Sequence, residues 1–207
     1  MDGRHDRPMG DITLDNFTFF PLAFRMKYID RWGLMRGTDT ENLLEHSAEC
    51  AILAHALACI GNAYFGKHYD AGGIAVKALY HDTSEIYTGD LPTPVKYQNA
   101  ALSESYKAIE REACERLLAK LPEALCNTYR CALDHESDED VRKLVKAADK
   151  LCALIKCIRE TENGNREFAA ALASTRASVE KSAADCPELR YFMKNILPEF
   201  EKSLDEL

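Results

Sequence analysis

The chain has 207 residues, of which 46% are hydrophobic and 29% charged, a balance typical of one globular domain with a substantial core. Its formal net charge of −8 argues against a protein that binds nucleic acid along an extended backbone, although a small anionic substrate remains compatible. Polar residues interrupt the longest apolar stretches, and the N-terminus has no apolar signal region. We therefore expect a cytoplasmic protein without a membrane span.

The eight cysteines stand singly in the sequence, without a C-x-x-C motif. Cys152 and Cys157 lie within an apolar helical pattern. We expect the cysteines to be reduced and to fill helix cores rather than to bind a structural zinc ion.

Apolar residues recur at helical spacing through nearly the whole chain, and no convincing strand alternation is present. We predict an all-α, compact helical bundle over residues 17–207, preceded by a loose extension over 1–16. The helices expected in chain order cover about 20–32, 39–61 or 39–66, 70–81, 98–120, 122–134, 138–163, 165–182 and 187–204.

Local sequence signals place several of these boundaries. A capping box at Thr38–Glu41 would begin the second helix, and Gly33 would end the first. Pro92 and Pro94 prevent a helix between Tyr87 and Pro94, and Pro198 should distort the last helix.

Three of the predicted helices carry ionisable residues on an apolar face, namely His46, the pair His81-Asp82, and Asp149. A lone histidine in the position of His46 is more often a satisfied core residue than a ligand. A buried carboxylate such as Asp149, however, requires a cation. Imidazole and carboxylate ligands together suit Mn, Fe, Co, Ni or Zn, whereas Mg and Ca prefer oxygen ligands. The four residues therefore predict a divalent metal site.

Candidates for chemistry flank these residues. Glu85 follows Asp82 by three positions and could exchange a proton with a substrate, or be a solvated charge. Asp90 lies in a Gly-Asp turn, and Arg31 has donors that match phosphate oxygens. Trp32 is either a substrate contact or a packing anchor, and we expect Lys96 to be a surface residue rather than a phosphate contact. These residues predict a metal-dependent hydrolase of phosphate esters.

The motifs around these residues resemble those of the HD-domain metal-dependent phosphohydrolases and, more closely, the bacterial 5′-deoxynucleotidases of the YfbR type. The resemblance extends from about Phe20 to the C-terminus, and its most specific part runs from Thr88 to Tyr97. The motifs are Arg31-Trp32, Thr40-Glu41-Asn42, Glu45-His46-Ser47, Tyr80-His81-Asp82-Thr-Ser-Glu85, Thr88-Gly-Asp90-Leu-Pro-Thr-Pro-Val-Lys-Tyr97, Leu144-Val-Lys-Ala-Ala-Asp149 and Tyr191-Phe-Met.

The resemblance implies that the chain hydrolyses deoxyribonucleoside 5′-monophosphates to deoxyribonucleosides and phosphate, and that it forms a homodimer. It also implies one divalent ion as cofactor, cobalt or manganese first, with iron, nickel, zinc, copper and magnesium left open. The implied metal ligands are His46, His81, Asp82 and Asp149.

The same resemblance assigns roles around the ion. Arg31 would orient the phosphate, and Trp32 would lie against the sugar and exclude a 2′-hydroxyl. Glu85 and Asp90 would be the acid and base, in an order that the sequence leaves open. The residues implied to contact substrate are Arg31, Trp32, His46, Asp82, Asp90, Leu91, Pro92, Thr93 and Asp149.

Two other functions stay open. An HD hydrolase that acts on nucleoside triphosphates or signalling nucleotides would need more basic residues than Arg31 and Lys96 near the site. A catalytically silent helical scaffold would be expected to lack a metal ligand, Glu85 or Asp90, and all of these are present.

Overall fold

The computed structural model describes residues 17–92, 96 and 99–206. In this part of the chain the regular elements are helices, and the only extended pairing is an isolated antiparallel bridge between Asp30 and Asn42, which confirms the all-α prediction. The longer helices are α2 (Leu43–Tyr64), α3 (Ala71–Tyr80), α6 (Ala100–Leu118), α7 (Glu123–Leu133), α8 (Glu139–Glu162), α9 (Ala169–Ala183) and α10 (Pro187–Asn195). The predicted extension over residues 1–16 lies outside the described residues.

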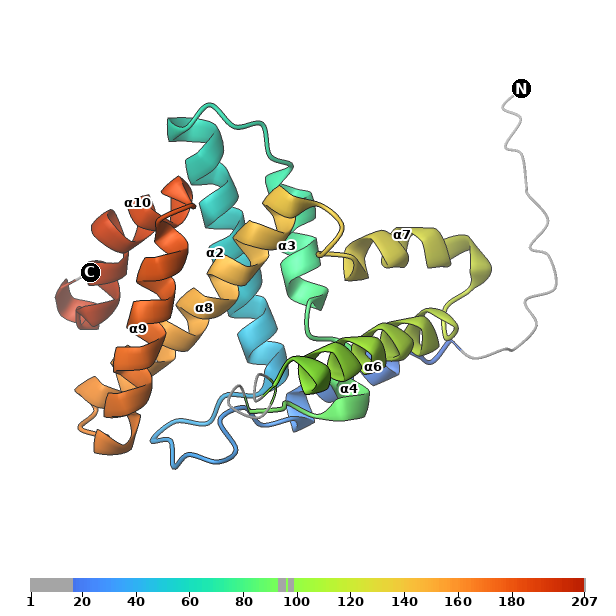
Figure 1. Cartoon of the computed structure of the whole chain (residues 1–207), viewed down its shortest axis with the longest axis horizontal. Coiled ribbons are helices and arrows are strands. Elements are labelled where there is room, and N and C mark those ends of the chain that lie inside the picture. Colours follow the sequence, from blue (N-terminus) through green and yellow to red (C-terminus); the bar gives the residue numbers. More distant parts are fainter. Residues whose placement is uncertain (1–16, 93–95, 97–98, 207) are drawn as a thin grey trace, which may run out of the picture.

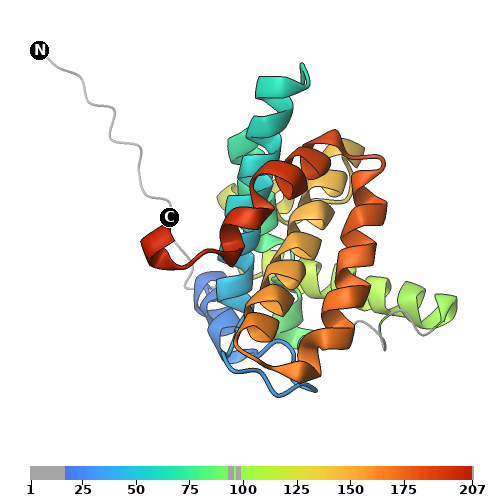
Figure 2. The ribbon, with the colours of Figure 1, turned by 90° about the vertical axis from the view of Figure 1, so that its left-hand side faces the viewer.

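The centre of the fold is formed by α2, which packs against α3, α8 and α10, while α8 also packs against α9 (Figure 1). The view turned by 90° shows α8 and α9 side by side in front of α2 (Figure 2). Buried leucines from these helices form the main core, among them Leu57, Leu151, Leu154 and Leu189. Each fully buried leucine contributes about 1.5–3 kcal/mol relative to an exposed one. The helices at this core are therefore held firmly relative to one another.

The first turn of α2 is fixed by a capping box four residues later than predicted. The Asn42 side chain accepts hydrogen bonds from the backbone N–H groups of Leu44 and Glu45, and the Glu45 carboxylate accepts one from the Asn42 N–H. The predicted box at Thr38–Glu41 is therefore wrong, and the carboxylate of Glu41 is left free for other contacts. At the other end, α2 stops at Tyr64, and Gly66 has a left-handed φ of 64°, which favours glycine.

By length and composition alone, α2 is long and apolar enough to cross a membrane. The expectation that the chain has no membrane span did not take this helix into account. Half of its apolar window is buried against the other helices, as in the core helix of a globular protein.

The N-terminal part of the described chain differs from the predicted first helix. The α-helix α1 covers only Phe19–Ala23, a 3₁₀ helix η1 covers Phe24–Tyr28, and Ile29 is extended. The chain then pairs with the segment before α2, because the Leu43 N–H donates to the Ile29 carbonyl and the Arg31 N–H donates to the Glu41 carbonyl. Arg31 and Trp32 therefore lie in a loop, and the prediction that they end a helix is wrong.

A second, smaller core lies beside the first. It is formed by Phe19, Leu117, Leu118, Leu121 and Leu133, which come from α1, the end of α6, the turn after it, and α7. The short helix α4 (Glu85–Thr88) packs against α6, and Tyr80 at the end of α3 packs against this cluster. The link between α3 and α4 is thus held between two cores.

The later helices agree with the prediction to within a few residues, except at the C-terminus. There α10 ends at Asn195, and the chain continues as the 3₁₀ helix η3 (Leu197–Glu201). Pro198 lies at the start of η3, where its missing N–H is tolerated. A further 3₁₀ turn, η2 (Arg166–Phe168), precedes α9, and η4 (Leu204–Glu206) closes the described chain.

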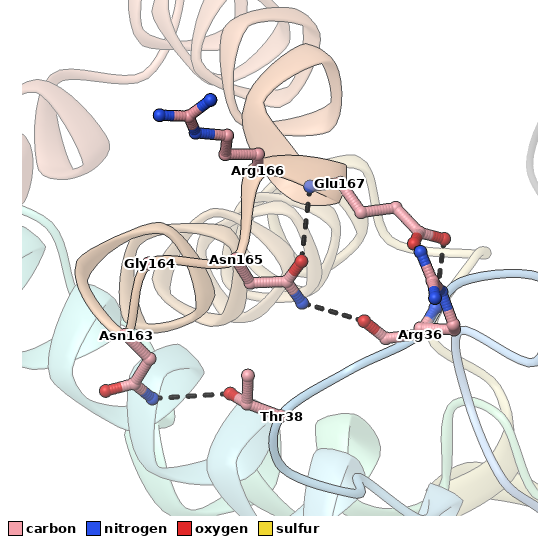
Figure 3. Close-up of a pocket in the computed structure, with 7 residues that line it drawn as sticks. All are labelled: Arg36, Thr38, Asn163, Gly164, Asn165, Arg166 and Glu167. Atoms are coloured by element: carbon pink, nitrogen blue, oxygen red, sulfur yellow. Dashed lines mark hydrogen bonds and ion pairs between the residues drawn. The ribbon is translucent and has the colours of Figure 1, made fainter.

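The loop before α2 is anchored on the C-terminal end of α8. Glu160, whose exposed fraction is 1%, accepts hydrogen bonds from the backbone N–H groups of Thr38 and Asp39 and from the side chain of Asn165. Figure 3 shows the surface pocket beside this contact, of about 350 Å³, where Asn165 donates to the Arg36 carbonyl. These contacts hold the loop that leads into Glu41.

Candidate active site

The four predicted metal ligands come from three different parts of the core and converge. His46 lies in the first half of α2, His81 directly follows α3, Asp82 lies in the turn after it, and Asp149 lies in the middle of α8. Ligand atoms of His46, His81 and Asp149 all lie within 4.8 Å of one another. The fourth residue joins them, because Oδ2 of Asp82 lies 3.1 Å from Nε2 of His81 and 3.6 Å from Nε2 of His46.

The orientation of both imidazoles fits a metal ion. Nδ1 of His81 donates to the Ala78 carbonyl at 2.7 Å, and Nδ1 of His46 lies 3.3 Å from a carboxylate oxygen of Glu41. Each ring therefore turns Nε2 toward the cluster. Among the described residues, neither buried Nε2 makes a hydrogen bond of good geometry, although carboxylate oxygens of Asp149 and Asp82 lie 3.3 Å and 3.1 Å from Nε2 of His46 and His81, respectively. Two unpartnered imidazole nitrogens beside two carboxylates are the donor set that a divalent transition metal requires.

Charge in the cluster is strongly coupled. Burial opposes ionisation of Asp82 and Asp149, but the neighbouring imidazoles of His81 and His46, respectively, lower the pKa of the two carboxyls. Burial likewise opposes protonation of His46 and His81, yet Asp149 and Asp82, respectively, raise the pKa of the two rings. The groups thus hold one another in charged form, and a cation that binds here replaces protons. Asp149 was predicted to be buried. Its side chain is surrounded by protein atoms, which is the burial that acts on its pKa, but 42% of its surface remains exposed, so an incoming ion can reach it.

Arg31 faces the same cluster from the loop before α2. One of its terminal nitrogens, Nη1, lies 3.6 Å from Asp82 and 4.0 Å from Asp90, while its Nε donates to Glu41 at 3.0 Å. The side chain is 13% exposed, so its position is well defined by protein contacts. A guanidinium beside a metal cluster is suited to bind phosphate oxygens through parallel donors.

Trp32 has a backbone conformation that bulky residues rarely adopt, with φ at 59°. Such a residue typically costs about 1–3 kcal/mol and is often found at functional sites. Its indole ring lies 5.4 Å from that of Phe168, and its Nε1 donates to Glu41 at 3.1 Å. Trp32 is therefore both packed and hydrogen-bonded, and it lies next to Arg31.

Glu85 and Asp90 lie on the short segment after the α3–α4 link. Glu85 is the first residue of α4 and does not continue α3, and its side chain is buried. Burial, together with the carboxylates of Asp82 and Asp90, raises the pKa of Glu85 to about 9, so its carboxyl keeps a proton at neutral pH. Burial also raises the pKa of Asp90, although Arg31 opposes this. Both carboxyls therefore hold a proton more strongly than a free carboxyl does.

The turn that carries Asp90 is shaped by its neighbours. Gly89 has a left-handed φ of 71° and ends α4, and the Thr88 hydroxyl is 3.2 Å from that of Tyr106 in α6. The predicted substrate contacts Leu91 and Pro92 follow in irregular structure, whereas Thr93 lies outside the described residues. Lys96 forms a 2.7 Å ion pair with Glu110, and its side chain is 22% exposed.

One residue in this site was missed by the sequence reasoning. Glu41 was assigned to a helix cap, but its carboxylate contacts Arg31, Trp32 and His46. The sequence signal was the place of Glu41 in the Thr40-Glu41-Asn42 motif, five residues before the predicted ligand His46.

Known proteins resemble this chain in sequence and in fold. A 5′-deoxynucleotidase of Vibrio vulnificus (strain YJ016) is 46% identical over 190 residues, which cover 91% of this chain and 97% of the relative. A 5′-deoxynucleotidase of Yersinia pestis (strain Pestoides F) is 47% identical over 192 residues, 91% and 95% of the two chains. Among solved structures, an HD-domain phosphohydrolase from Listeria innocua matches with a TM-score of 0.76 at 23% identity, over 88% of each chain.

A second solved structure is a cyanophage S-2L HD phosphohydrolase bound to dA and one catalytic Zn²⁺ ion. It matches with a TM-score of 0.61 at 19% identity, over 90% of this chain and 96% of that one. These two structural likenesses show the HD-domain fold, as predicted. The profile of the 5′-deoxynucleotidase YfbR-like family matches residues 18–200. The chain therefore belongs to the 5′-deoxynucleotidase YfbR-like family.

Proposed function

We propose that the protein is a metal-dependent phosphomonoesterase that hydrolyses deoxyribonucleoside 5′-monophosphates to deoxyribonucleosides and phosphate. The observation that carries this proposal is the convergence of His46, His81, Asp82 and Asp149 directly beside Arg31. The names of the two bacterial relatives, each covered over nearly its whole length, support the deoxynucleotide as substrate.

The four ligands would hold one divalent ion, for which we propose cobalt or manganese. Such an ion stabilises the negative charge that develops on the phosphoryl oxygens. Arg31 would bind the same phosphate, with its Nε held by Glu41 and its Nη1 close to Asp82 and Asp90. Because Arg31 is held by protein contacts before substrate arrives, little reorganisation is needed when the charge develops.

Glu85 and Asp90 are the proposed acid and base. Glu85 is buried and holds its proton, so it can donate to the 5′-oxygen of the departing nucleoside. Asp90 lies 4.0 Å from Arg31 and is partly accessible, so it can orient the attacking water. The proposed substrate contacts follow Asp90 at Leu91, Pro92 and Thr93.

Trp32 is the proposed sugar contact. Its ring is held between Phe168 and Glu41, directly beside the phosphate-binding Arg31. A rigid indole in this place would leave room for a 2′-hydrogen but not for a 2′-hydroxyl.

The test is phosphate release from paired substrates, dAMP against AMP and dUMP against UMP, by chelator-treated protein with and without cobalt or manganese. We expect metal-dependent turnover of the deoxy substrates alone. Turnover of both sugars would retain the phosphatase and refute the sugar selectivity. Absence of release from every monophosphate would refute the proposal and direct attention to nucleoside triphosphates. Triphosphates are disfavoured because they carry more negative charge than a monophosphate, and Lys96, the second basic residue named for this region, is paired with Glu110.

We also propose that the enzyme is a cytoplasmic homodimer whose catalytic domain comprises residues 17–207. Several aromatic residues at the start of the described chain support a covered surface, since Phe24 is 65% and Tyr28 66% exposed. Sedimentation of the purified protein distinguishes a dimer from a monomer.

A further inference from the structure

One carboxylate in the site contacts three residues with different proposed tasks. Glu41 lies at the end of the loop before α2, and its side chain is 12% exposed. Its Oε1 accepts a hydrogen bond from Nε of Arg31 at 3.0 Å and lies 3.3 Å from Nδ1 of His46. Its Oε2 accepts a hydrogen bond from Nε1 of Trp32 at 3.1 Å. A metal ligand, a phosphate contact and a sugar contact therefore meet at one side chain.

The backbone reinforces the same link. The Arg31 N–H donates to the Glu41 carbonyl at 2.9 Å, so the two residues are joined through main chain and side chain. Trp32 follows with its left-handed φ of 59°, a conformation that surrounding contacts must maintain. The hydrogen bond from its indole to Glu41 is the polar contact that fixes the ring.

A role for Glu41 in helix formation does not explain these contacts. The first turn of α2 is capped by Asn42 and Glu45. The carboxylate of Glu41 contacts Arg31, Trp32 and His46 instead. A carboxylate at Nδ1 of a ligating histidine fixes the ring orientation and raises the basicity of Nε2.

We propose that Glu41 is a positioning residue that links metal binding to sugar selectivity. It holds Nε2 of His46 toward the ion, and it holds Arg31 and Trp32 in the single arrangement that admits a deoxyribose phosphate. The part of the proposal that concerns the sugar rests on the proposed function. The part that concerns His46 requires only the metal site.

The test compares Glu41→Gln with wild type and with the matched control Glu49→Gln. Glutamine keeps the size of the side chain, but one of its two ends cannot accept a hydrogen bond. Glu49 lies eight residues later, has a half-exposed side chain (46%) and pairs only with Arg159 among the described residues, so its variant should behave as wild type. Calorimetric titration with cobalt or manganese alone measures the metal affinity without any need for activity. The ratio of kcat/KM for dAMP to that for AMP measures sugar selectivity.

For Glu41→Gln we expect metal affinity to fall by about 10–100-fold, as is usual for partners of ligating histidines. We expect the deoxy-to-ribo ratio to fall by roughly tenfold, because a contact displaced by about 1 Å can change rates by about 100-fold. A folded Glu41→Gln protein in which either quantity matches that of Glu49→Gln would overturn the link.

A second variant keeps the proposal testable if Glu41→Gln does not fold. Trp32→Phe removes the donor to Glu41 and replaces the indole by a smaller aromatic ring, but it leaves the contact between Glu41 and His46 in place. Selectivity should therefore fall while metal affinity stays unchanged. Unchanged selectivity in Trp32→Phe would overturn the role of Glu41 at the sugar. If wild type hydrolyses no deoxynucleotide, the proposed function fails, whereas the metal titration still tests Glu41.

Discussion

Glu160 illustrates how the loop that leads into the site is held, and its replacement by glutamine gives a quantitative prediction. Oε1 of Glu160 forms an ion pair with Nζ of Lys156 at 2.7 Å and accepts a hydrogen bond from the Asp39 N–H at 3.2 Å. Oε2 accepts hydrogen bonds from the N–H and the hydroxyl of Thr38, at 2.7 and 2.9 Å, and from the side-chain amide of Asn165 at 2.9 Å. Both oxygens thus accept from at least two donors, and the loop before α2 lies over the carboxylate near the protein surface.

Glutamine has the same shape but one acceptor end, so at least two of these hydrogen bonds are lost and two donors face an amide N–H₂. Hydrogen bonds to a charged group contribute about 1.5–3 kcal/mol each, and water near the surface can replace part of this. We therefore expect Glu160→Gln to lower the free energy of unfolding by roughly 2–4 kcal/mol. For a domain of this size that corresponds to a decrease in Tm of roughly 5–15 °C.

The pH dependence of this difference has a defined sign. Burial opposes ionisation of Glu160, but Lys156 and the Thr38 N–H lower its pKa below the ordinary value of 4.5. The stabilisation is therefore complete above pH 4.5 and is lost as the pH falls toward the lower native pKa. The difference in Tm between wild type and Glu160→Gln should shrink between about pH 5 and pH 3.

Thermal unfolding followed by circular dichroism in the presence of a chelator measures these differences without a contribution from bound metal. Glu162→Gln is the matched control, because Glu162 is the last residue of the same helix, two positions after Glu160, and is exposed. A decrease of less than about 2 °C for Glu160→Gln, or a difference that grows on acidification, would refute the reasoning.

Three further substitutions test the site directly. Asp149→Ala should abolish phosphate release and lower metal occupancy together, because one ligand of four is lost; a variant that is active and fully loaded in elemental analysis would remove Asp149 from the site. Glu85→Gln should reduce kcat by about 100-fold or more while metal content stays unchanged, since proton transfer typically contributes factors of 10²–10⁴; a normal kcat would exclude Glu85 as the acid. Trp32→Ala should admit AMP and UMP, and unchanged discrimination in competition assays would assign the exclusion of the 2′-hydroxyl to another residue.

The sequence was most informative where chemistry and helical periodicity coincide. His46, His81 and Asp149 could be identified because a polar group on an apolar helix face needs a partner, and their convergence in the fold agrees with that expectation. Asp82 followed from its place beside His81. These inferences needed only local pattern, since each ligand is carried by one of the helices that build the core or by the turn at its end.

Features that depend on distant contacts could not be predicted in this way. Arg31 and Trp32 look helical in the sequence, but pairing of their segment with residues 41–43 forces an extended chain and a left-handed turn. Glu160 resembles any charged residue on a long helix, and only the loop folded over it reveals its role. Glu41 was assigned to a capping box that begins at Thr38, but the helix is capped four residues later by Asn42 and Glu45. Its carboxylate contacts Arg31, Trp32 and His46 instead, through a loop that the local sequence does not reveal.

The distribution of the ligands over α2, the end of α3 and α8 has a consequence beyond catalysis. These elements meet at the main core, so an ion bound by all of them acts as a reversible crosslink between segments more than one hundred residues apart in sequence. A ligand that binds only the folded protein at 100 times its Kd adds about 2.7 kcal/mol to the free energy of unfolding. The lifetime of the folded chain should therefore depend on the supply of the metal, and a cell short of that metal would lose the protein as well as its activity.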